Sequence, residues 1–181
     1  MCKKKRVNSK QNSSLTTKTV RLKGNNMIKL LFICHGNICR SPMAEFLFRH
    51  MAEEQGVGHL FEVASAATSR EEIGNPVHPG TVRKLAPLGI STKGKVARQM
   101  TRQDYVDYDY LICMDEYNMR NMMRITGGDP HQKMFRILDL TEDPRDVADP
   151  WYTGNFDVTF RDIQEGCQLL IDHFKKQAAY K

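Results

Sequence analysis

The feature that most restricts the fold of this chain is a short apolar run, Ile28–Cys34, that ends in a loop containing glycine. Polar residues precede the run, and such a segment is typical of a buried strand in a parallel sheet. Ser41 and Pro42 follow the loop and predict the start of a helix, with serine as the N-cap and proline in the first turn. Gly56 is expected to end this helix. The folded part therefore begins with a strand, a tight loop and a helix.

The same alternation continues along the chain. Three further segments have the composition of short strands: Phe61–Ala67, Tyr110–Met114 and Met134–Leu138. Helices are predicted over His78–Leu88, Glu116–Ile125 and Phe156–Lys176. Val96–Met100 fits neither pattern, and Asp104–Asp109 is too polar for the core. Strands separated by helices predict an α/β fold, a three-layer sandwich in which a four-stranded parallel sheet is flanked by helices.

Charge divides the chain into two parts. Eight of the 27 Lys and Arg residues lie in residues 1–26, which contain no Asp or Glu, so residues 27–181 hold 19 basic against 21 acidic residues. The overall charge of +6 therefore belongs to the N-terminal stretch, which is predicted to be a disordered, solvated extension. Binding of nucleic acid through this extension is the weaker interpretation. Residues 27–181 are predicted to form a single domain.

Cysteine usage and hydropathy indicate the compartment. The five cysteines are an odd number without the spacing of a zinc site, which argues against a disulfide scaffold and against a metal centre. Charged residues interrupt every apolar run before it reaches the length of a membrane span. No uninterrupted apolar segment follows the basic N-terminus before Met27, as it would in a secretory signal. We therefore expect a cytoplasmic protein with reduced thiols.

The loop after the first strand has the residues of an oxyanion site. In parallel α/β sheets, ligands bind at the carboxyl ends of the strands, where the loop Cys34–Arg40 falls. Inward-pointing loop amides and the helix N-terminus can together hold a tetrahedral oxyanion. Gly36 and Asn37 tolerate the backbone conformations that such a loop requires. Arg40 can grip two phosphate oxygens at once.

The same loop indicates cysteine-based phosphoryl transfer. A positive environment favours the thiolate of Cys34, which is an in-line nucleophile for a bound phosphomonoester. Ser41 can donate a hydrogen bond to this thiolate and stabilise it as a leaving group. The alternative is a buried strand-end cysteine and an unrelated surface arginine, Arg40. That alternative is weaker because the strand, the glycine and the helix start accompany the pair.

Such a reaction also needs an acid for the leaving oxygen and a base for water. Asp149, in the loop 139–155 after the last strand, is the best candidate because the following proline restricts it. Trp151 and Tyr152 come next and suit an aryl phosphate that lies between ring walls. Asp143 is a rival in the same loop, but it lacks aromatic neighbours.

From Ile28 to the C-terminal helix, the chain resembles the low-molecular-weight protein-tyrosine phosphatases. The segments that carry the resemblance are CHGNICRSPMAE at 34–45, SAATS at 65–69, EIGNP at 72–76, VARQ at 96–99, DYLICMDE at 109–116 and ADPWYTG at 148–154. The resemblance implies the phosphotyrosine phosphatase I-like fold. It also implies hydrolysis of phosphotyrosine in proteins, and of small aryl phosphates, through a phosphocysteine intermediate, with no metal or cofactor.

By matching position, the resemblance makes Cys34 the nucleophile, Arg40 the phosphate-binding arginine and Asp149 the general acid. The substrate-binding residues that it implies are His35, Gly36, Asn37, Ile38, Cys39, Ser41, Trp151 and Tyr152. Cys39 also matches a second loop cysteine that forms a reversible disulfide with the nucleophile under oxidation. Asp115, at the end of the third strand, is expected from the topology to orient Arg40. The implied partners are phosphotyrosine-containing proteins, and phosphate or other oxyanions bound in the loop.

Three positions depart from the family pattern. His35 stands where many members have an apolar or small residue, and Lys95 stands where histidine is frequent. Glu71 stands where an aromatic residue often forms the second wall of the substrate cleft. Losing that ring predicts weaker aromatic clamping and a preference for substrates with basic flanks.

Related activities on the same fold are the main alternatives. Arsenate reductases need a relay of further cysteines in a mobile segment, whereas Cys113 and Cys167 are predicted in a buried strand and in the C-terminal helix. Protein-arginine phosphatases carry threonine at the position of Ile38, so Ile38 and the aromatic pair favour an aryl substrate. A phosphoprotein-binding module without turnover is disfavoured because the proposed catalytic set is intact.

Overall fold

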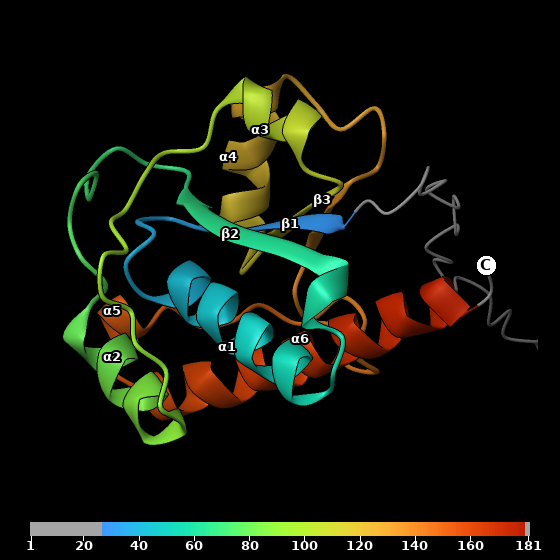
Figure 1. Cartoon of the computed structure of the whole chain (residues 1–181). Coiled ribbons are helices and arrows are strands. Elements are labelled where there is room, and N and C mark those ends of the chain that lie inside the picture. The colour runs from blue at the N-terminus through green and yellow to red at the C-terminus, as the bar shows by residue number, and fades with distance from the viewer. Residues whose placement is uncertain (1–26, 180–181) are drawn as a thin grey trace, which may run out of the picture.

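A computed structural model describes residues 27–179 of the chain, so the predicted disorder of residues 1–26 lies outside the described residues. Four strands form one sheet, in the order β2-β1-β3-β4, and all neighbours are parallel (Figure 1). The strands are β1 (Ile28–Cys34), β2 (Phe61–Ala67), β3 (Tyr110–Cys113) and β4 (Met134–Arg136). The predicted four-stranded parallel sheet is confirmed, and the last strand ends two residues earlier than expected.

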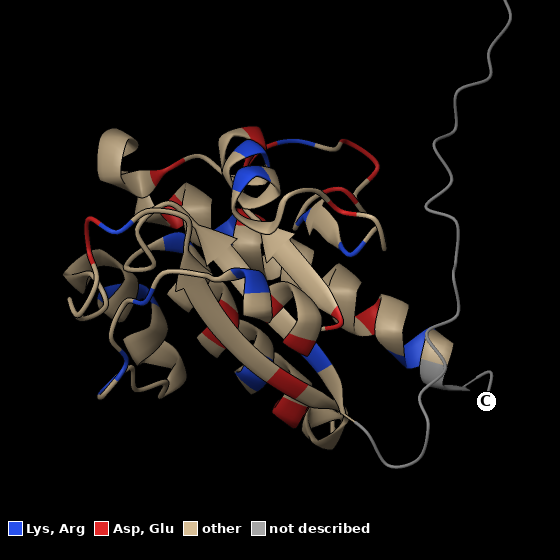
Figure 2. Ribbon diagram, turned by 90° about the horizontal axis from the view of Figure 1, so that it is seen from above, with Lys and Arg blue, Asp and Glu red and all other residues tan. Residues whose placement is uncertain are grey.

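Helices cover both faces of this sheet, as predicted. They are α1 (Arg40–Glu54), α2 (Pro79–Leu85), α3 (Arg102–Asp107), α4 (Glu116–Thr126), α5 (Pro150–Thr153) and α6 (Phe156–Ala179), with short 3₁₀ turns at Gly58–Leu60 and Ala86–Leu88. Helices α1, α2 and α6 lie on one face of the sheet, and α3 and α4 lie on the other (Figure 1). Figure 2 shows basic and acidic residues spread over the helices and loops around largely uncharged strands. In residues 27–179, no helix is long and apolar enough to cross a bilayer.

The side chains of β1 explain why both faces must be covered. Leu30 and Phe32 point to one side and join the core beneath α1 and α6, whereas Leu31 and Ile33 point to the other and pack with Met122 of α4. Successive side chains of a strand alternate between the two faces of a sheet. These four side chains of β1 are fully buried. A continuous apolar run is therefore the sequence pattern of a central strand in this fold.

A glycine lets α6 approach the sheet closely. A Cβ atom at Gly166 would lie 2.5 Å from Cγ1 of Ile137 and 2.9 Å from its backbone oxygen. Ile137, just after β4, is fully buried. The close approach seals the core between α6 and the chain that leaves β4.

Two local expectations are corrected. Helix α1 begins at Arg40 with Cys39 in the N-cap position, and no side chain caps it, so Ser41 is not the N-cap. The reason is that the Ser41 hydroxyl is engaged with the loop, 3.0 Å from Cys34 Sγ. The polar segment 104–109 also contributes to the interior, because Asp104 is only 7% exposed. Its carboxylate accepts from the backbone N–H of Thr101 in a capping box at the start of α3. It also accepts from both terminal nitrogens of Arg98 (2.9 and 3.0 Å), and this ion pair balances the buried charge.

The register of the sheet brings the carboxyl ends of its strands to one edge. Cys34 pairs with Ala67, and the residue before it, Ile33, pairs with Cys113. The chain returns to the same edge after β4, where the Val147 N–H donates to the backbone oxygen of Met114 (2.8 Å). The loops that contain the predicted nucleophile and the predicted acid therefore meet at this edge.

Candidate active site

The loop between β1 and α1 is held in shape by Asn37. This residue has a φ of 59°, in the left-handed region that asparagine tolerates better than most residues. Its side-chain amide donates to Ser41 Oγ (2.9 Å) and to Ser65 Oγ (2.8 Å). Its carbonyl oxygen accepts from the backbone N–H of Arg98 (3.2 Å). The loop is thereby tied to α1, to β2 and to the segment after residue 95.

Cys34 lies at the floor of this loop and is 3% exposed. The backbone N–H of Asn37 donates to Sγ (3.3 Å), and Ser41 Oγ lies 3.0 Å from the same sulfur. Because the Asn37 amide donates to Ser41 Oγ, the serine hydrogen remains for the sulfur or for the more distant backbone oxygen of Ala66 (3.4 Å). Hydrogen-bond donors directed at sulfur stabilise a thiolate.

A buried chain of polar contacts continues behind Asn37 and ends in ion pairs. Ser65 Oγ donates to Glu45 Oε2 (2.6 Å), and Lys95 Nζ lies 2.8 Å from the same oxygen. The other carboxylate oxygen of Glu45 accepts from Arg49 (2.9 Å). Lys95, noted above only as a departure, thus anchors the network that holds the loop. The roles of Ser65 and Glu45 were missed, although a serine in an apolar strand and a glutamate one turn into a helix were visible signals.

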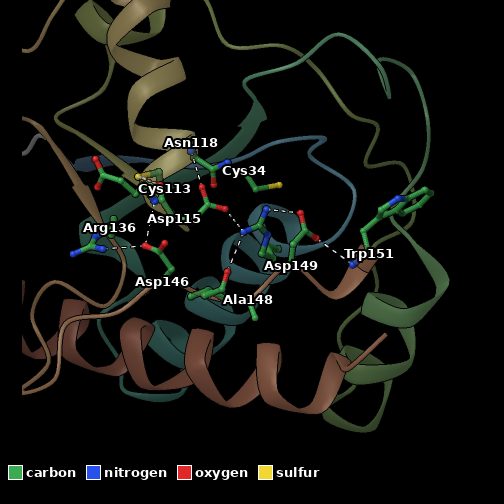
Figure 3. A network of polar contacts seen from close by, with 12 residues as sticks. Cys34, Cys113, Asp115, Asn118, Arg136, Asp146, Ala148, Asp149 and Trp151 are labelled. Carbon is green, nitrogen blue, oxygen red and sulfur yellow. Dashed lines mark hydrogen bonds and ion pairs between the residues drawn. The ribbon is translucent and has the colours of Figure 1, made fainter. Parts of the chain in front are cut away.

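Arg40 is buried and paired with two carboxylates, Asp115 and Asp149, which are both labelled near Cys34 in Figure 3. Its Nη1 donates to Asp115 Oδ2 (2.5 Å) and to the backbone oxygen of Val147 (3.0 Å), and its Nη2 donates to Asp149 Oδ2 (2.6 Å). The contact with Asp115 confirms the expectation from the topology. Burial by itself would lower the pKa of the Arg40 guanidinium, but the charges of Cys34, Asp149 and Asp115 raise it above its ordinary value.

Asp149 is held at the mouth of the site by two contacts. It is the N-cap of α5, where its Oδ1 accepts from the backbone N–H of Trp151 (3.1 Å), while Oδ2 accepts from Arg40. The side chain is 21% exposed, so the carboxylate reaches both solvent and the site. Asp143, the rival candidate, lies in an exposed bend and does not line the pocket. The structure therefore brings Asp149, and not Asp143, to Cys34 and Arg40.

A single pocket gathers most of the predicted site residues. It is lined by Cys34, His35, Gly36, Ile38, Cys39, Arg40, Glu71, Asp149, Trp151 and Tyr152. Asn37 and Ser41 lie beneath it and hold its floor through the contacts described above. Trp151 and Tyr152 are 58% and 82% exposed, so their rings are available at the mouth. The Trp151 ring meets the His78 ring edge-on at a centroid distance of 5.9 Å, which supports the aromatic part of the lining.

Three other cysteines lie within residues 27–179, and all three are buried. Burial raises the pKa of Cys39 to about 12, and the neighbouring Cys34 adds to the rise. Burial likewise raises the pKa of Cys113 and of Cys167, which lie in β3 and α6 as predicted. All three are thiols at neutral pH. Across residues 27–179, no group of three or more His, Cys, Asp and Glu side chains is arranged to hold a metal ion.

Comparisons with known proteins agree with this geometry. Residues 29–180 match the family named Low molecular weight phosphotyrosine protein phosphatase. The chain is 42% identical over 153 residues to the low molecular weight protein-tyrosine-phosphatase YfkJ of Bacillus subtilis. The match covers 83% of this chain and 98% of the relative. It is 38% identical over 156 residues to PtpA of Staphylococcus epidermidis, which covers 86% and 99% of the two chains.

Solved structures show the same likeness. The crystal structure of YfkJ from Bacillus subtilis superposes with a TM-score of 0.81 at 41% identity, covering 86% of this chain and 99% of that one. The low molecular weight protein tyrosine phosphatase from Streptococcus pyogenes superposes with a TM-score of 0.72 at 34% identity, covering 81% and 93%.

Proposed function

The chain belongs to the low molecular weight phosphotyrosine protein phosphatase family and is a protein-tyrosine phosphatase, and we propose that Cys34, Arg40 and Asp149 carry out its reaction. One observation carries this assignment. Cys34 Sγ accepts from the backbone N–H of Asn37 (3.3 Å) at the floor of the pocket, and Arg40 joins that floor to Asp149 at the mouth through a 2.6 Å contact.

In the first step, the phosphate of the substrate enters the loop beneath its aryl group. The incoming oxygens replace the Asp149 carboxylate at Nη2 of Arg40, which leaves Asp149 beside the oxygen that joins phosphorus to the ring. The Cys34 thiolate attacks phosphorus, the S–P bond forms and the P–O(aryl) bond breaks. Asp149, which takes up a proton from solvent once it has left Arg40, gives this proton to the departing phenolic oxygen.

In the second step, water attacks the phosphorus of phosphocysteine. The Asp149 carboxylate takes a proton from this water, the S–P bond breaks and inorganic phosphate leaves. Ser41 donates to the departing thiolate, which the 3.0 Å separation of Oγ and Sγ favours. Cys34 is thus the nucleophile, Arg40 binds the phosphate and Asp149 carries the proton. Ser41 donates a hydrogen bond to the thiolate, and no step calls for a metal or a redox cofactor.

The substrate class follows from the lining of the pocket. Exposed Trp151 and Tyr152 offer ring faces to the aryl group of phosphotyrosine, and Ile38 adds an apolar surface in the loop itself. We propose that His35, Gly36 and Cys39 complete the contacts to substrate, while Asn37 shapes the loop. Partners are then proteins that contain phosphotyrosine, and free phosphate competes for the same loop.

A cytoplasmic location and a single catalytic domain over residues 27–181 are further parts of the proposal. The nucleophilic thiol must stay reduced, and the four cysteines of the described residues are free. One core under α1 and α6 and another under α3 and α4 share the same sheet, which supports a single folding unit.

The decisive experiment is the substitution Cys34→Ser. We expect it to abolish turnover of p-nitrophenyl phosphate while inorganic phosphate still binds, as measured by calorimetry. Trapping of phosphocysteine in the natural protein by rapid acid quench, followed by mass spectrometry of the Cys34 peptide, gives a positive readout. Turnover by Cys34→Ser at the natural rate would refute the assignment of the nucleophile. Preference for phosphoarginine over phosphotyrosine peptides would instead overturn the substrate class.

A further inference from the structure

The lining of the pocket contains one polar pair that the reaction does not use. His35 follows the nucleophile directly, and Glu71 comes from the loop after β2. His35 Nε2 lies 3.0 Å from Glu71 Oε2, and both residues line the pocket together with Trp151 and Tyr152. One part of the mouth is thus aromatic, and another part carries a carboxylate where the family often places a ring.

The Glu71 carboxylate is held by His35 but remains largely exposed to solvent. Its side chain is 71% exposed, and in residues 27–179 no lysine or arginine forms an ion pair with it. His35 is itself held in place, because its backbone oxygen accepts from the Ser69 N–H (3.0 Å) and its ring lies 6.2 Å from the ring of Tyr117. Within residues 27–179, the Glu71 carboxylate therefore lines the pocket with His35 as its one ion-pair partner.

The charge of the floor does not neutralise this carboxylate. Arg40 is paired with Asp115 and Asp149, and during binding its guanidinium turns to the phosphate of the substrate. A doubly negative phosphate adds to the negative charge at the mouth. A cationic group brought by the substrate is therefore attracted to Glu71, and an anionic group is repelled.

Chain geometry places the neighbours of phosphotyrosine within reach. When the aryl ring fills the pocket, the Cα atoms of the two adjacent residues lie about 3.8 Å from that of phosphotyrosine, at the mouth. Lysine and arginine side chains are long and flexible enough to bridge from there to a carboxylate on the lining. His35 contacts only one oxygen of Glu71, so the carboxylate keeps acceptor sites for either cation.

We propose that Glu71, positioned by His35, accepts a lysine or arginine side chain directly adjacent to phosphotyrosine and so selects substrates with a basic neighbour. This inference rests on the proposed function of the pocket and adds a specificity-determining residue to it. Exposed ion pairs are weak, so the selection is a matter of several-fold differences in kcat/KM.

The test uses one phosphotyrosine peptide in which the residue before or after phosphotyrosine is Lys, Ala or Glu. For the natural protein at low salt we expect kcat/KM to be about three- to tenfold higher for Lys than for Glu. The ratio should approach one in high salt, because exposed charges are screened. Glu71→Gln should bring the ratio near one at low salt, and Glu71→Lys should invert it. Glu142→Lys, at an exposed position outside the pocket, should keep the natural ratio.

Ratios within one variant cancel any general loss of activity or stability. The inference would be overturned if kcat/KM of the natural protein were equal for the Lys and Glu peptides at low salt. It would also be overturned if Glu71→Lys still preferred the Lys peptide. The second of these outcomes would place the cation on the face of Trp151 instead. If the protein hydrolyses none of these phosphotyrosine peptides, the result contradicts the proposed function and not merely its selectivity.

Discussion

Asp149 has two structural contacts besides its proposed role as the acid, and two substitutions can separate them. Its Oδ1 caps α5 through the Trp151 N–H, and its Oδ2 pairs with Arg40. Asp149→Asn keeps a side-chain oxygen for the cap, because asparagine caps helices as well as aspartate does. Asp149→Ala removes the cap as well. Neither variant can transfer a proton.

The expected magnitudes follow from these contacts. Loss of a general acid lowers kcat/KM by roughly 10²–10⁴, or about 2.7–5.5 kcal/mol in the barrier. Both variants should show this loss, while only Asp149→Ala should lose about 1 kcal/mol of stability with the cap. Arg40 keeps Asp115 and the Val147 oxygen as partners in either variant. Inorganic phosphate should therefore inhibit as strongly as before, or more strongly, because a competing carboxylate has been removed.

The assay is a series of aryl phosphates whose phenols differ in acidity. The loss of kcat/KM, which covers the steps up to release of the phenol and excludes hydrolysis of phosphocysteine, should be largest for phenyl phosphate and smaller for p-nitrophenyl phosphate, because p-nitrophenolate leaves more readily without a proton. Asp143→Asn serves as the control and should behave like the natural protein. Equal losses across the whole series would refute Asp149 as the acid, and a larger loss in Asp143→Asn would move the role to that residue.

Three further predictions concern the support of the site and of the core. Ser41→Ala should bind phosphate normally and slow hydrolysis of phosphocysteine by roughly 10- to 100-fold, as seen in pre-steady-state kinetics, since a hydrogen bond to a charged group is lost. Lys95→Met should lower the free energy of unfolding in urea by about 2 kcal/mol or more, because Glu45 remains charged and buried. The double variant that also carries Glu45→Gln should lose less, and equal losses would speak against the ion pair. Gly166→Ala should lower the free energy of unfolding by roughly 1–3 kcal/mol despite the better helix propensity of alanine, and an unchanged midpoint would show that α6 can shift.

Local sequence was a reliable guide where the determining contacts are close in the chain. The strand over 28–34, the loop and the residues Cys34 and Arg40 lie within thirteen positions, and their arrangement follows from a buried strand that feeds a helix. The same local reasoning was wrong about one detail, the N-cap of α1. Serine before proline usually caps a helix, but the Ser41 hydroxyl has a closer partner in the sulfur of Cys34.

Contacts between distant segments could be anticipated only in outline. The expectation that strand ends meet at one edge correctly placed Asp115 and Asp149 near Arg40, because parallel topology brings those loops together. It did not reveal the chain of contacts from Asn37 to Glu45 and Lys95, since such a network depends on which side chains face each other between β2, α1 and a loop.

By itself, the sequence determined the fold class, the phosphate loop and two of the three residues proposed for catalysis, Cys34 and Arg40, because these depend on apolar patterning and on short spacings. Only the tertiary structure decided which aspartate reaches the pocket and what Glu71 does there. In the sequence, Glu71 was noted only as a residue that replaces an aromatic side chain. In the folded protein it is a carboxylate fixed by His35, 36 positions earlier in the chain, at the mouth of the site. The physical reason is that the interaction of two charged or polar groups depends on their separation in space and their exposure to water, which residue identity does not contain.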